Sequence, residues 1–135
     1  MDKKVILLLL VVVVVIANYA ITEIQYNLQK EDTSVYVTVP SVGINETVNY
    51  ESIDKGVYYK QGVLFGHRTL HGSPFYNLDK VVVGDNIIFN GTTYTVDKIH
   101  TEPSDYMLVP EDNKIYLVTC TPIGINTHRI IVEAS

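Results

Sequence analysis

The sequence predicts an all-β domain, a barrel or a sandwich, that follows an apolar N-terminal segment. After residue 34, short runs of alternating apolar and polar residues recur, and Gly, Pro or Asn separates them. This spacing of strands and turns is typical of all-β folds. No helical period of useful length occurs in the same part of the sequence. The chain has 135 residues, of which 47% are apolar, so it accommodates one domain and an anchor.

The apolar N-terminal segment is expected to be an uncleaved membrane anchor. No charged residue occurs from Val5 to Thr22, a stretch of 18 residues, and about 17–25 apolar residues span the hydrocarbon core of a bilayer. A cleavable signal peptide is the alternative, but the end of the segment, Ala17-Asn18-Tyr19-Ala20, lacks the usual pattern of small residues. A buried core helix is less consistent with a run of leucines and valines that has no polar face.

The charges around this segment predict its orientation and the domain boundaries. Lys3 and Lys4 precede the span and acidic residues follow it, which favours a cytoplasmic N-terminus and an extracellular domain. We therefore expect an anchor over 1–22, a stalk over 23–34 and a folded domain over 35–135. The formal net charge of -5 at pH 7, with scattered Lys and Arg, argues against a nucleic-acid partner.

The strands of the domain are expected in the following order. The first covers Val35 to Val39 and stops at Pro40, because proline breaks the ladder. Asn90-Gly91 joins two further strands as a hairpin. Residues 70–78 are expected to form a loop or a single helical turn, and 101–113 a long connection. The other strands are expected after Gly43, around 63–65, and over 86–89, 92–100, 115–120 and 128–133.

The last two strands bring the only cysteine close to an arginine. Pro122 and Gly124 break the chain between the two runs, so the simplest arrangement is an antiparallel pair. Facing side chains of such a pair have Cβ atoms roughly 4.5–5.5 Å apart. Cys120 and Arg129 can therefore become neighbours from local geometry alone. A buried structural cysteine is the alternative interpretation of Cys120, since free cysteine is often buried.

Three separated motifs resemble those of sortases, the membrane-anchored cysteine transpeptidases. They are Gly66-His67-Arg68, then FYNLDK at 75–80 with Gly84-Asp85, and finally LVTCTP at 117–122 with NTHR at 126–129. The resemblance covers about 39–132, and its wording is closer to the pilin-type and sporulation-type classes than to the housekeeping class. It implies a closed, mixed β-barrel of about eight strands, a number that periodicity does not provide.

The resemblance implies that His67, Cys120 and Arg129 are the catalytic residues. Cys120 would attack as a thiolate, and His67 would act first as an acid and then as a base. The sequence leaves open whether His67 and Cys120 form an ion pair beforehand. Arg129 would stabilise the oxyanion, with Thr119 or a backbone N–H beside Cys120 as a second donor. His71 is the less favoured alternative to His67.

Other residues have weaker assignments. Thr121, Pro122 and Ile123 are candidates for the substrate groove, and the connection over 101–113 is the candidate for one of its walls. Arg68 is expected to be a surface or loop charge. No cofactor is expected. A calcium site would need clustered carboxylates, for which only Glu102, Asp105, Glu111 and Asp112 are candidates, and solvated loop charges explain these better.

By resemblance, the substrate is a surface protein with an LPxTG-like C-terminal sorting signal. Cys120 would hold the cleaved protein as a thioester until an amine of a cell-wall peptide or a pilin lysine displaces it. Two other functions are weighed against this one. An inactive, membrane-tethered domain would only bind sorting signals, and a simple cysteine endopeptidase would only hydrolyse them.

Overall fold

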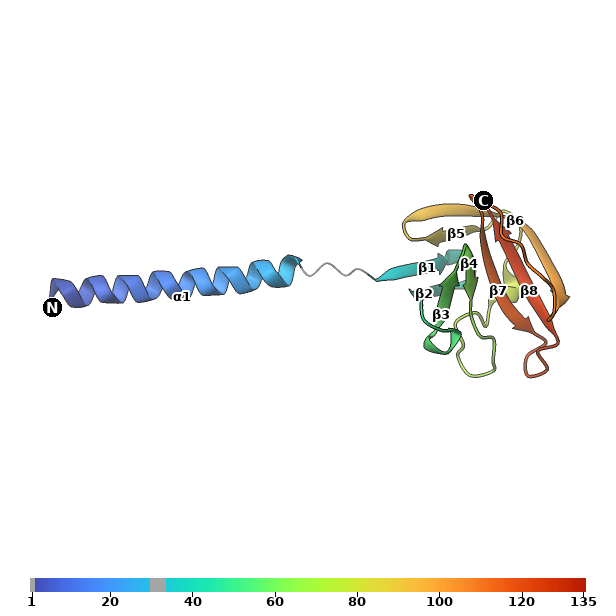
Figure 1. Ribbon diagram of the computed structural model, residues 1–135, viewed down its shortest axis with the longest axis horizontal. Helices are drawn as coiled ribbons and strands as arrows, with labels where there is room; N and C mark the ends of the chain where they lie inside the picture. The colour runs from blue at the N-terminus through green and yellow to red at the C-terminus, as the bar shows by residue number, and fades with distance from the viewer. Residues whose placement is uncertain (1, 30–33) are drawn as a thin grey trace. The chain divides into compact units, whose positions relative to one another are not determined.

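The computed structural model describes residues 2–29 and 34–135, and it consists of an N-terminal helix and a β-domain (Figure 1). Contacts divide the chain into two units, of which the second covers Ser34–Ser135. Residues 30–33, which belong to the expected stalk, lie outside the described residues.

The N-terminal helix α1 covers Lys3–Gln29. Its part from Lys3 to Thr22 is long and apolar enough to cross a membrane, and none of it is buried against the rest of the protein. Residues 5–16 are all valine, leucine or isoleucine, so this part of the helix has no polar face, as in a helix whose surroundings are apolar. A membrane anchor and a signal sequence share these properties.

Eight strands close into one barrel, which confirms the predicted fold class (Figure 1). Going round the barrel, the order is β1-β2-β3-β4-β7-β8-β6-β5. The pairs β2–β3 and β4–β7 are parallel and the other pairs are antiparallel. The strands are β1 (Val35–Val39), β2 (Ile44–Asn49), β3 (Val57–Lys60), β4 (Val63–Phe65), β5 (Asn86–Phe89), β6 (Thr92–Pro103), β7 (Ile115–Thr121) and β8 (His128–Ala134).

Short 3-10 helices lie in three of the connections. They are η1 (Pro40–Val42), η2 (Ile53–Lys55) and η3 (Leu78–Lys80). Two features of the strands differ from the sequence prediction. Strand β3 was not expected, and it joins β4 through Gln61 and Gly62, both at positive φ. Strand β6 is longer than expected because its pairing with β8 continues to Pro103, so the long connection begins at Ser104.

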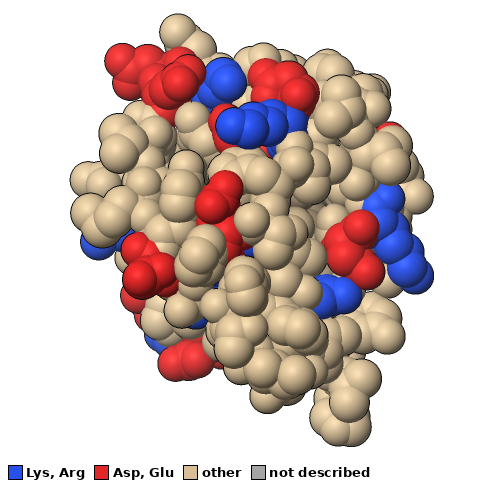
Figure 2. Space-filling model, turned by 90° about the vertical axis from the view of Figure 1, so that its right-hand side faces the viewer, with Lys and Arg blue, Asp and Glu red and all other residues tan. Residues whose placement is uncertain are grey.

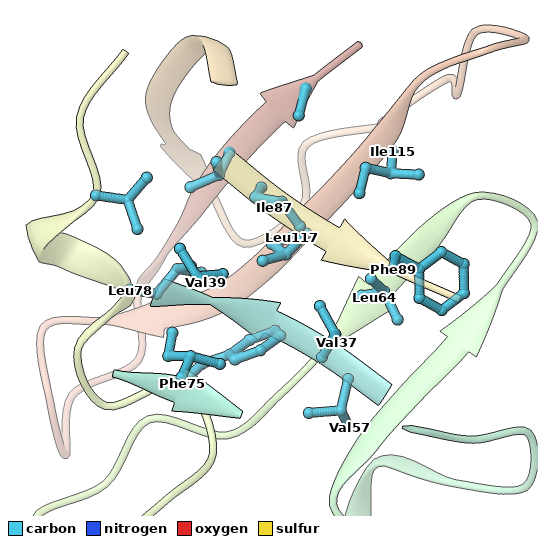
Figure 3. Packing of buried hydrophobic residues seen from close by; sticks show 14 of the residues in the cluster. Val37, Val39, Val57, Leu64, Phe75, Leu78, Ile87, Phe89, Ile115 and Leu117 are labelled. Atoms are coloured by element: carbon cyan, nitrogen blue, oxygen red, sulfur yellow. The ribbon is translucent and has the colours of Figure 1, made fainter. Parts of the chain in front are cut away.

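The barrel interior is filled by inward-facing apolar side chains from every strand. Figure 3 shows Val37 and Val39 of β1 packed near Leu64 of β4, Leu117 of β7 and Phe75 of the β4–β5 connection. Phe75 is fully buried although it lies outside any strand. The β4–β5 connection is therefore part of the core, and this anchors the segment that carries His67.

Strand β7 is apolar on both of its faces. Ile115 and Leu117 point into the barrel, whereas Tyr116 and Val118 pack on the outer face in a second cluster. A strand with one face exposed to solvent normally has polar residues on that face, whereas a strand that is buried on both faces is apolar on both. The outer face of β7 is therefore covered by other parts of the chain, and the candidate site lies there.

Charged side chains are mixed in sign over the face of the molecule in Figure 2. Lys and Arg lie next to Asp and Glu at several places on that face, and the area between them is uncharged.

Candidate active site

Cys120 and Arg129 are directly opposed in the antiparallel β7–β8 ladder. Cys120 is a free, half-buried thiol. Their neighbours Thr119 and Ile130 also oppose each other and are 2% and 7% exposed. Because successive side chains alternate between the two faces of a strand, Cys120 and Arg129 both lie on the outer face of the barrel. The structure thus brings the thiol and the guanidinium to one place.

His67 follows strand β4, which pairs in parallel with β7. Phe65 is level with Val118 in this pair, and the Gly66 N–H continues the ladder by donating to the Val118 carbonyl at 3.2 Å. Strand β4 ends at Phe65, and its register continued by two residues would place His67 level with Cys120.

Gly66 shows on which face the His67 side chain lies. A Cβ placed on Gly66 would be 2.6 Å from Cδ2 of Phe75, so this position faces the core. The alternation of β4 continued by one residue would place His67 on the opposite, outer face, where Cys120 lies. The row of His67, which follows β4, with Cys120 on β7 and Arg129 on β8 is the candidate active site.

Asp54 of η2 is a partner of His67 that the sequence did not reveal. Its Oδ1 lies 3.3 Å from Nε2 of His67, and both side chains are accessible to solvent. The contact joins the β2–β3 connection to the candidate site, and no local sequence pattern links residues so far apart. His71, the alternative histidine, lies exposed in the turn that follows.

Only one nitrogen of the Arg129 guanidinium, Nη1, donates hydrogen bonds within the described residues. Nη1 donates to the carbonyls of Asn126 and His128 at 2.9 and 3.0 Å, which holds the end of the β7–β8 loop. Within the described part of the chain, the N–H groups of Nε and Nη2 have no partner. Two neighbouring donors are therefore available to a ligand, since guanidinium presents its N–H groups as a planar fork.

An apolar groove of about 370 Å³ adjoins this row at Arg129, and neither Cys120 nor His67 is among the residues that line it. Its floor is made by the row that precedes the candidate site, Phe65, Val118 and Ile131, which pair across the same three strands. Arg129 lines one end of it. The connection between β6 and β7 provides the facing wall through Tyr106, Met107, Leu108 and Pro110. These residues belong to the segment 101–113 that was proposed as one wall of the substrate groove.

The three residues that the sequence suggested for the substrate groove, Thr121, Pro122 and Ile123, are not part of this lining. Thr121 and Pro122 line a separate hollow of about 480 Å³, next to the inward-facing Ile99 and Ile130. Ile123 is half-buried in the β7–β8 loop. The apolar run from Ile115 to Val118 was the signal that could have identified the groove floor, because it leaves no polar face on β7.

Two residues next to the row have buried contacts. The Thr119 hydroxyl donates to the Gly66 carbonyl at 2.7 Å. Arg68 was expected to be a surface or loop charge. It lies in the β4–β5 connection, but its side chain is only 11% exposed and forms an ion pair with Asp79.

The acidic residues considered for calcium do not gather. In residues 2–29 and 34–135, no group of three or more His, Cys, Asp or Glu side chains is arranged to hold a metal ion. Glu102 instead accepts a hydrogen bond from Nδ1 of His100 at 2.9 Å, and Glu133 lies 2.7 Å from Nε2 of the same ring.

Comparison with known proteins identifies the class to which this barrel and this row of residues belong. The sortase domain profile matches residues 37–135. The chain belongs to the sortase family, whose members are cysteine transpeptidases. No curated protein sequence matches the chain.

Solved structures of sortases share the fold, and most of the similar ones are sortase C enzymes. The pilus-related sortase C of Group B Streptococcus has a TM-score of 0.64 and 26% identity, over 77% of this chain and 66% of that chain. Clostridium perfringens sortase C, solved with the C-terminal cell wall sorting motif, has a TM-score of 0.62 and 25% identity, over 73% and 67%. A lid mutant of sortase A from Corynebacterium diphtheriae has a TM-score of 0.59 and 27% identity, over 82% of this chain and 74% of that chain. This chain therefore spans about two thirds to three quarters of these structures.

Proposed function

We propose that this chain is a membrane-anchored cysteine transpeptidase that cleaves an LPxTG-like C-terminal sorting signal. It transfers the cleaved protein to an amine of a cell-wall peptide or of a pilin subunit. The proposal is supported by the opposed pair Cys120 and Arg129 on β7 and β8, by the Arg129 side chain that lines an apolar groove, and by the place of His67 just after β4, the parallel neighbour of β7. A domain that only binds a peptide has no need of a thiol, an imidazole and a guanidinium in one row.

The first half of the proposed reaction forms a thioester. The Cys120 thiolate attacks the carbonyl of the scissile peptide bond, so that an S–C bond forms and negative charge develops on the carbonyl oxygen. The C–N bond then breaks, and His67 gives its proton to the departing amine. The sulfur now carries the acyl group of the cleaved protein, and the imidazole is neutral.

The second half of the reaction releases the thioester to an amine. The neutral His67 takes a proton from the incoming amine as its nitrogen attacks the acyl carbon. A new C–N bond forms, the S–C bond breaks, and Cys120 leaves as thiolate. The imidazole is protonated again, so both groups return to their starting states.

Arg129 stabilises the oxyanion in both halves. Its Nη1 is used on the β7–β8 loop, and this contact fixes the direction of the guanidinium plane. The Nε and Nη2 N–H groups remain to bind an oxygen, and donors that are held in place before the charge develops are the effective ones. The Thr119 hydroxyl is engaged with Gly66, so a backbone N–H next to Cys120 is the better second donor.

The groove supports an extended, largely apolar peptide as the substrate. Phe65, Val118 and Ile131 offer an apolar floor, and the β6–β7 connection offers an apolar wall. A peptide that lies along the strands toward the row would bring its scissile bond to Cys120. Burial of its side chains in the groove also removes water near the thioester, which favours attack by an amine.

The apolar part of α1 serves as the membrane anchor in this proposal. Lys3 and Lys4 at its start favour a cytoplasmic N-terminus, which leaves the barrel outside the cell, where surface proteins are attached. An uncleaved anchor keeps the enzyme near substrates that are themselves held in the membrane.

One assay tests the proposal against its two alternatives. The full chain in detergent is incubated with a fluorogenic LPxTG-type peptide, with and without triglycine as the amine. Ligated product supports the transpeptidase. Hydrolysis that triglycine does not divert indicates an endopeptidase, and peptide binding without cleavage indicates an inactive binding domain.

A further inference from the structure

We propose that Arg68 and Thr121 are positioning residues that hold His67 beside Cys120, together with the hydrogen bond between Thr119 and Gly66. This inference rests on the proposed function, because it concerns the geometry of the same site. It concerns four residues that flank the reacting pair in the sequence. Gly66 and Arg68 flank His67, and Thr119 and Thr121 flank Cys120.

The first tie lies before the reacting pair. The Thr119 hydroxyl donates to the carbonyl of Gly66 at 2.7 Å, and the Gly66 N–H donates to the carbonyl of Val118. Thr119 is 2% exposed, so its hydrogen bond is shielded from water. Gly66 is thus fixed to β7 by its N–H and by its carbonyl, although β4 itself ends at Phe65.

The second tie lies after the reacting pair. Nη1 of Arg68 donates to Oγ1 of Thr121 at 3.3 Å. Nε of Arg68 donates to the Tyr76 carbonyl at 3.1 Å, and Nη2 lies 3.1 Å from Oδ2 of Asp79. One guanidinium therefore joins the end of β7 to two points of the β4–β5 connection, and Asp79 balances its charge.

The two ties replace the strand ladder where β4 stops. Beyond Phe65 the chain leaves β4 and enters the long β4–β5 connection, so backbone pairing no longer fixes His67. Both ties lie on the inner side of β7, because Thr119 and Thr121 share one face of the strand. His67 and Cys120 take part in neither tie. The separation between imidazole and thiol then depends on the two ties on the inner side of β7, whose groups contact neither the substrate nor the sulfur.

This arrangement explains why the residue after His67 is an arginine with little exposure. Three contacts in three directions need a planar fork, which an ammonium group cannot provide in the same geometry. Catalysis is sensitive to such placement, since a misplacement of about 1 Å can lower a rate by about 100-fold.

A double-mutant cycle tests whether the second tie acts through His67. Thr121→Val removes the hydroxyl with little change in side-chain shape, and Thr121→Ser keeps it. Thr38→Val is the matched control, because the Thr38 hydroxyl also makes one hydrogen bond between neighbouring strands, to Asn45 at 3.1 Å, away from the site. The rate of peptide transfer is measured for each variant of the full chain in detergent, alone and combined with His67→Ala.

We expect Thr121→Val to lower kcat roughly 10- to 100-fold with little change in KM, because the peptide groove lies on the other face of β7. Thr121→Ser restores most of the rate, and Thr38→Val matches the unmodified chain. In the presence of His67→Ala, Thr121→Val causes no further loss. The inference is overturned if Thr121→Val leaves the rate unchanged. It is also overturned if Thr121→Val lowers the rate of the His67→Ala variant by the same factor as it lowers the rate of the unmodified chain. If thermal melting shows that Thr121→Val is unfolded, Arg68→Lys takes its place in the same cycle with the same two outcomes.

A second readout separates this inference from the proposed function. If the unmodified chain neither cleaves nor ligates any sorting peptide, the proposed function fails, but alkylation of Cys120 by iodoacetamide still reports on its neighbours, since the thiolate is the reacting form. We expect His67→Ala and Thr121→Val to change the alkylation rate in the same direction, and the double variant to match His67→Ala. The proposed role of the tie would be contradicted if Thr121→Val did not change the alkylation rate, or if its effect were independent of that of His67→Ala.

Discussion

The thiol of Cys120 and the guanidinium of Arg129 project from directly opposed positions of β7 and β8, on the outer face of the barrel. This relationship is local, because a hairpin of this register creates it without help from the rest of the chain. The third group of the proposed site, His67, lies just after β4, and only the parallel pairing of β4 with β7 brings that segment near Cys120. The site therefore depends on the β7–β8 pairing, which is local in sequence, and on the β4–β7 pairing, which joins distant segments.

Arg129→Lys should lose most of the activity although the charge is kept. Lysine offers no planar pair of donors to the oxyanion, and it also releases the carbonyls of Asn126 and His128 that Nη1 holds. Removal of one oxyanion donor lowers kcat by about 10²–10³. Steady-state kinetics with a sorting peptide provide the measurement, and a kcat close to that of the unmodified chain would rule out the oxyanion role.

Met107→Ser should raise KM for the sorting peptide and leave kcat unchanged. Met107 lines the groove, yet it is 84% exposed, so its apolar surface becomes buried only when a peptide binds. Loss of about 1.4 kcal/mol of such burial corresponds to roughly a tenfold weaker affinity.

Val109→Ser is the control for this prediction. Val109 lies on the same connection and is 79% exposed, but it is not part of the groove lining. It should leave KM unchanged. Equal effects of the two substitutions would show that the peptide does not bind in this groove.

Gly66→Ala should destabilise the barrel and disturb the site together. The added Cβ would lie 2.6 Å from the ring of the fully buried Phe75, and overpacking of a core costs about 1–3 kcal/mol. Urea unfolding measures the free energy. The double variant with Phe75→Leu should recover part of the loss, because the smaller side chain relieves the contact. No recovery would place the cause outside this packing.

His100→Ala should lower stability by about 1 kcal/mol, because it removes a partner shared by Glu102 and Glu133. Glu133 keeps Lys98 and Lys114 at 4.0 and 3.8 Å, which limits the loss. Both ring nitrogens of His100 face a carboxylate oxygen, at 2.9 and 2.7 Å, and the side chains of His100 and Glu133 are 13% and 12% exposed. His128→Ala is the control, since His128 is exposed and should have little effect. Similar losses in urea unfolding for both variants would contradict this account.

Much of the barrel could be predicted from the sequence because its strands alternate and its turns carry Gly, Pro or Asn. Strand β1 and strand β5 match their expected ranges, and the last two strands form the expected hairpin. Strand β3 was missed because its run, VYYK, is short and has aromatic residues on both faces. Periodicity also gives no strand count, because nothing local records that the sheet closes.

The candidate site shows the same division between local and long-range information. Cys120 and Arg129 were placed together by a local argument, whereas His67 was assigned by resemblance alone. The partners Asp54 and Thr121 could not be predicted from the sequence, because each contact joins segments that are distant in the chain. For the same reason the sequence predicted a surface or loop charge at Arg68 and did not reveal the three partners of its guanidinium.

Detection of an acyl intermediate on Cys120 is a direct test of the proposed reaction. The full chain in detergent is mixed with an LPxTG-type peptide, quenched in acid and digested, and the fragment that contains Cys120 is weighed by mass spectrometry. We expect that fragment to carry the acyl part of the peptide, to lose it when triglycine is added as ligated product forms, and to remain unmodified in His67→Ala. Ligated product that forms equally well with Cys120→Ala, or an acyl group on any other residue, would contradict the account.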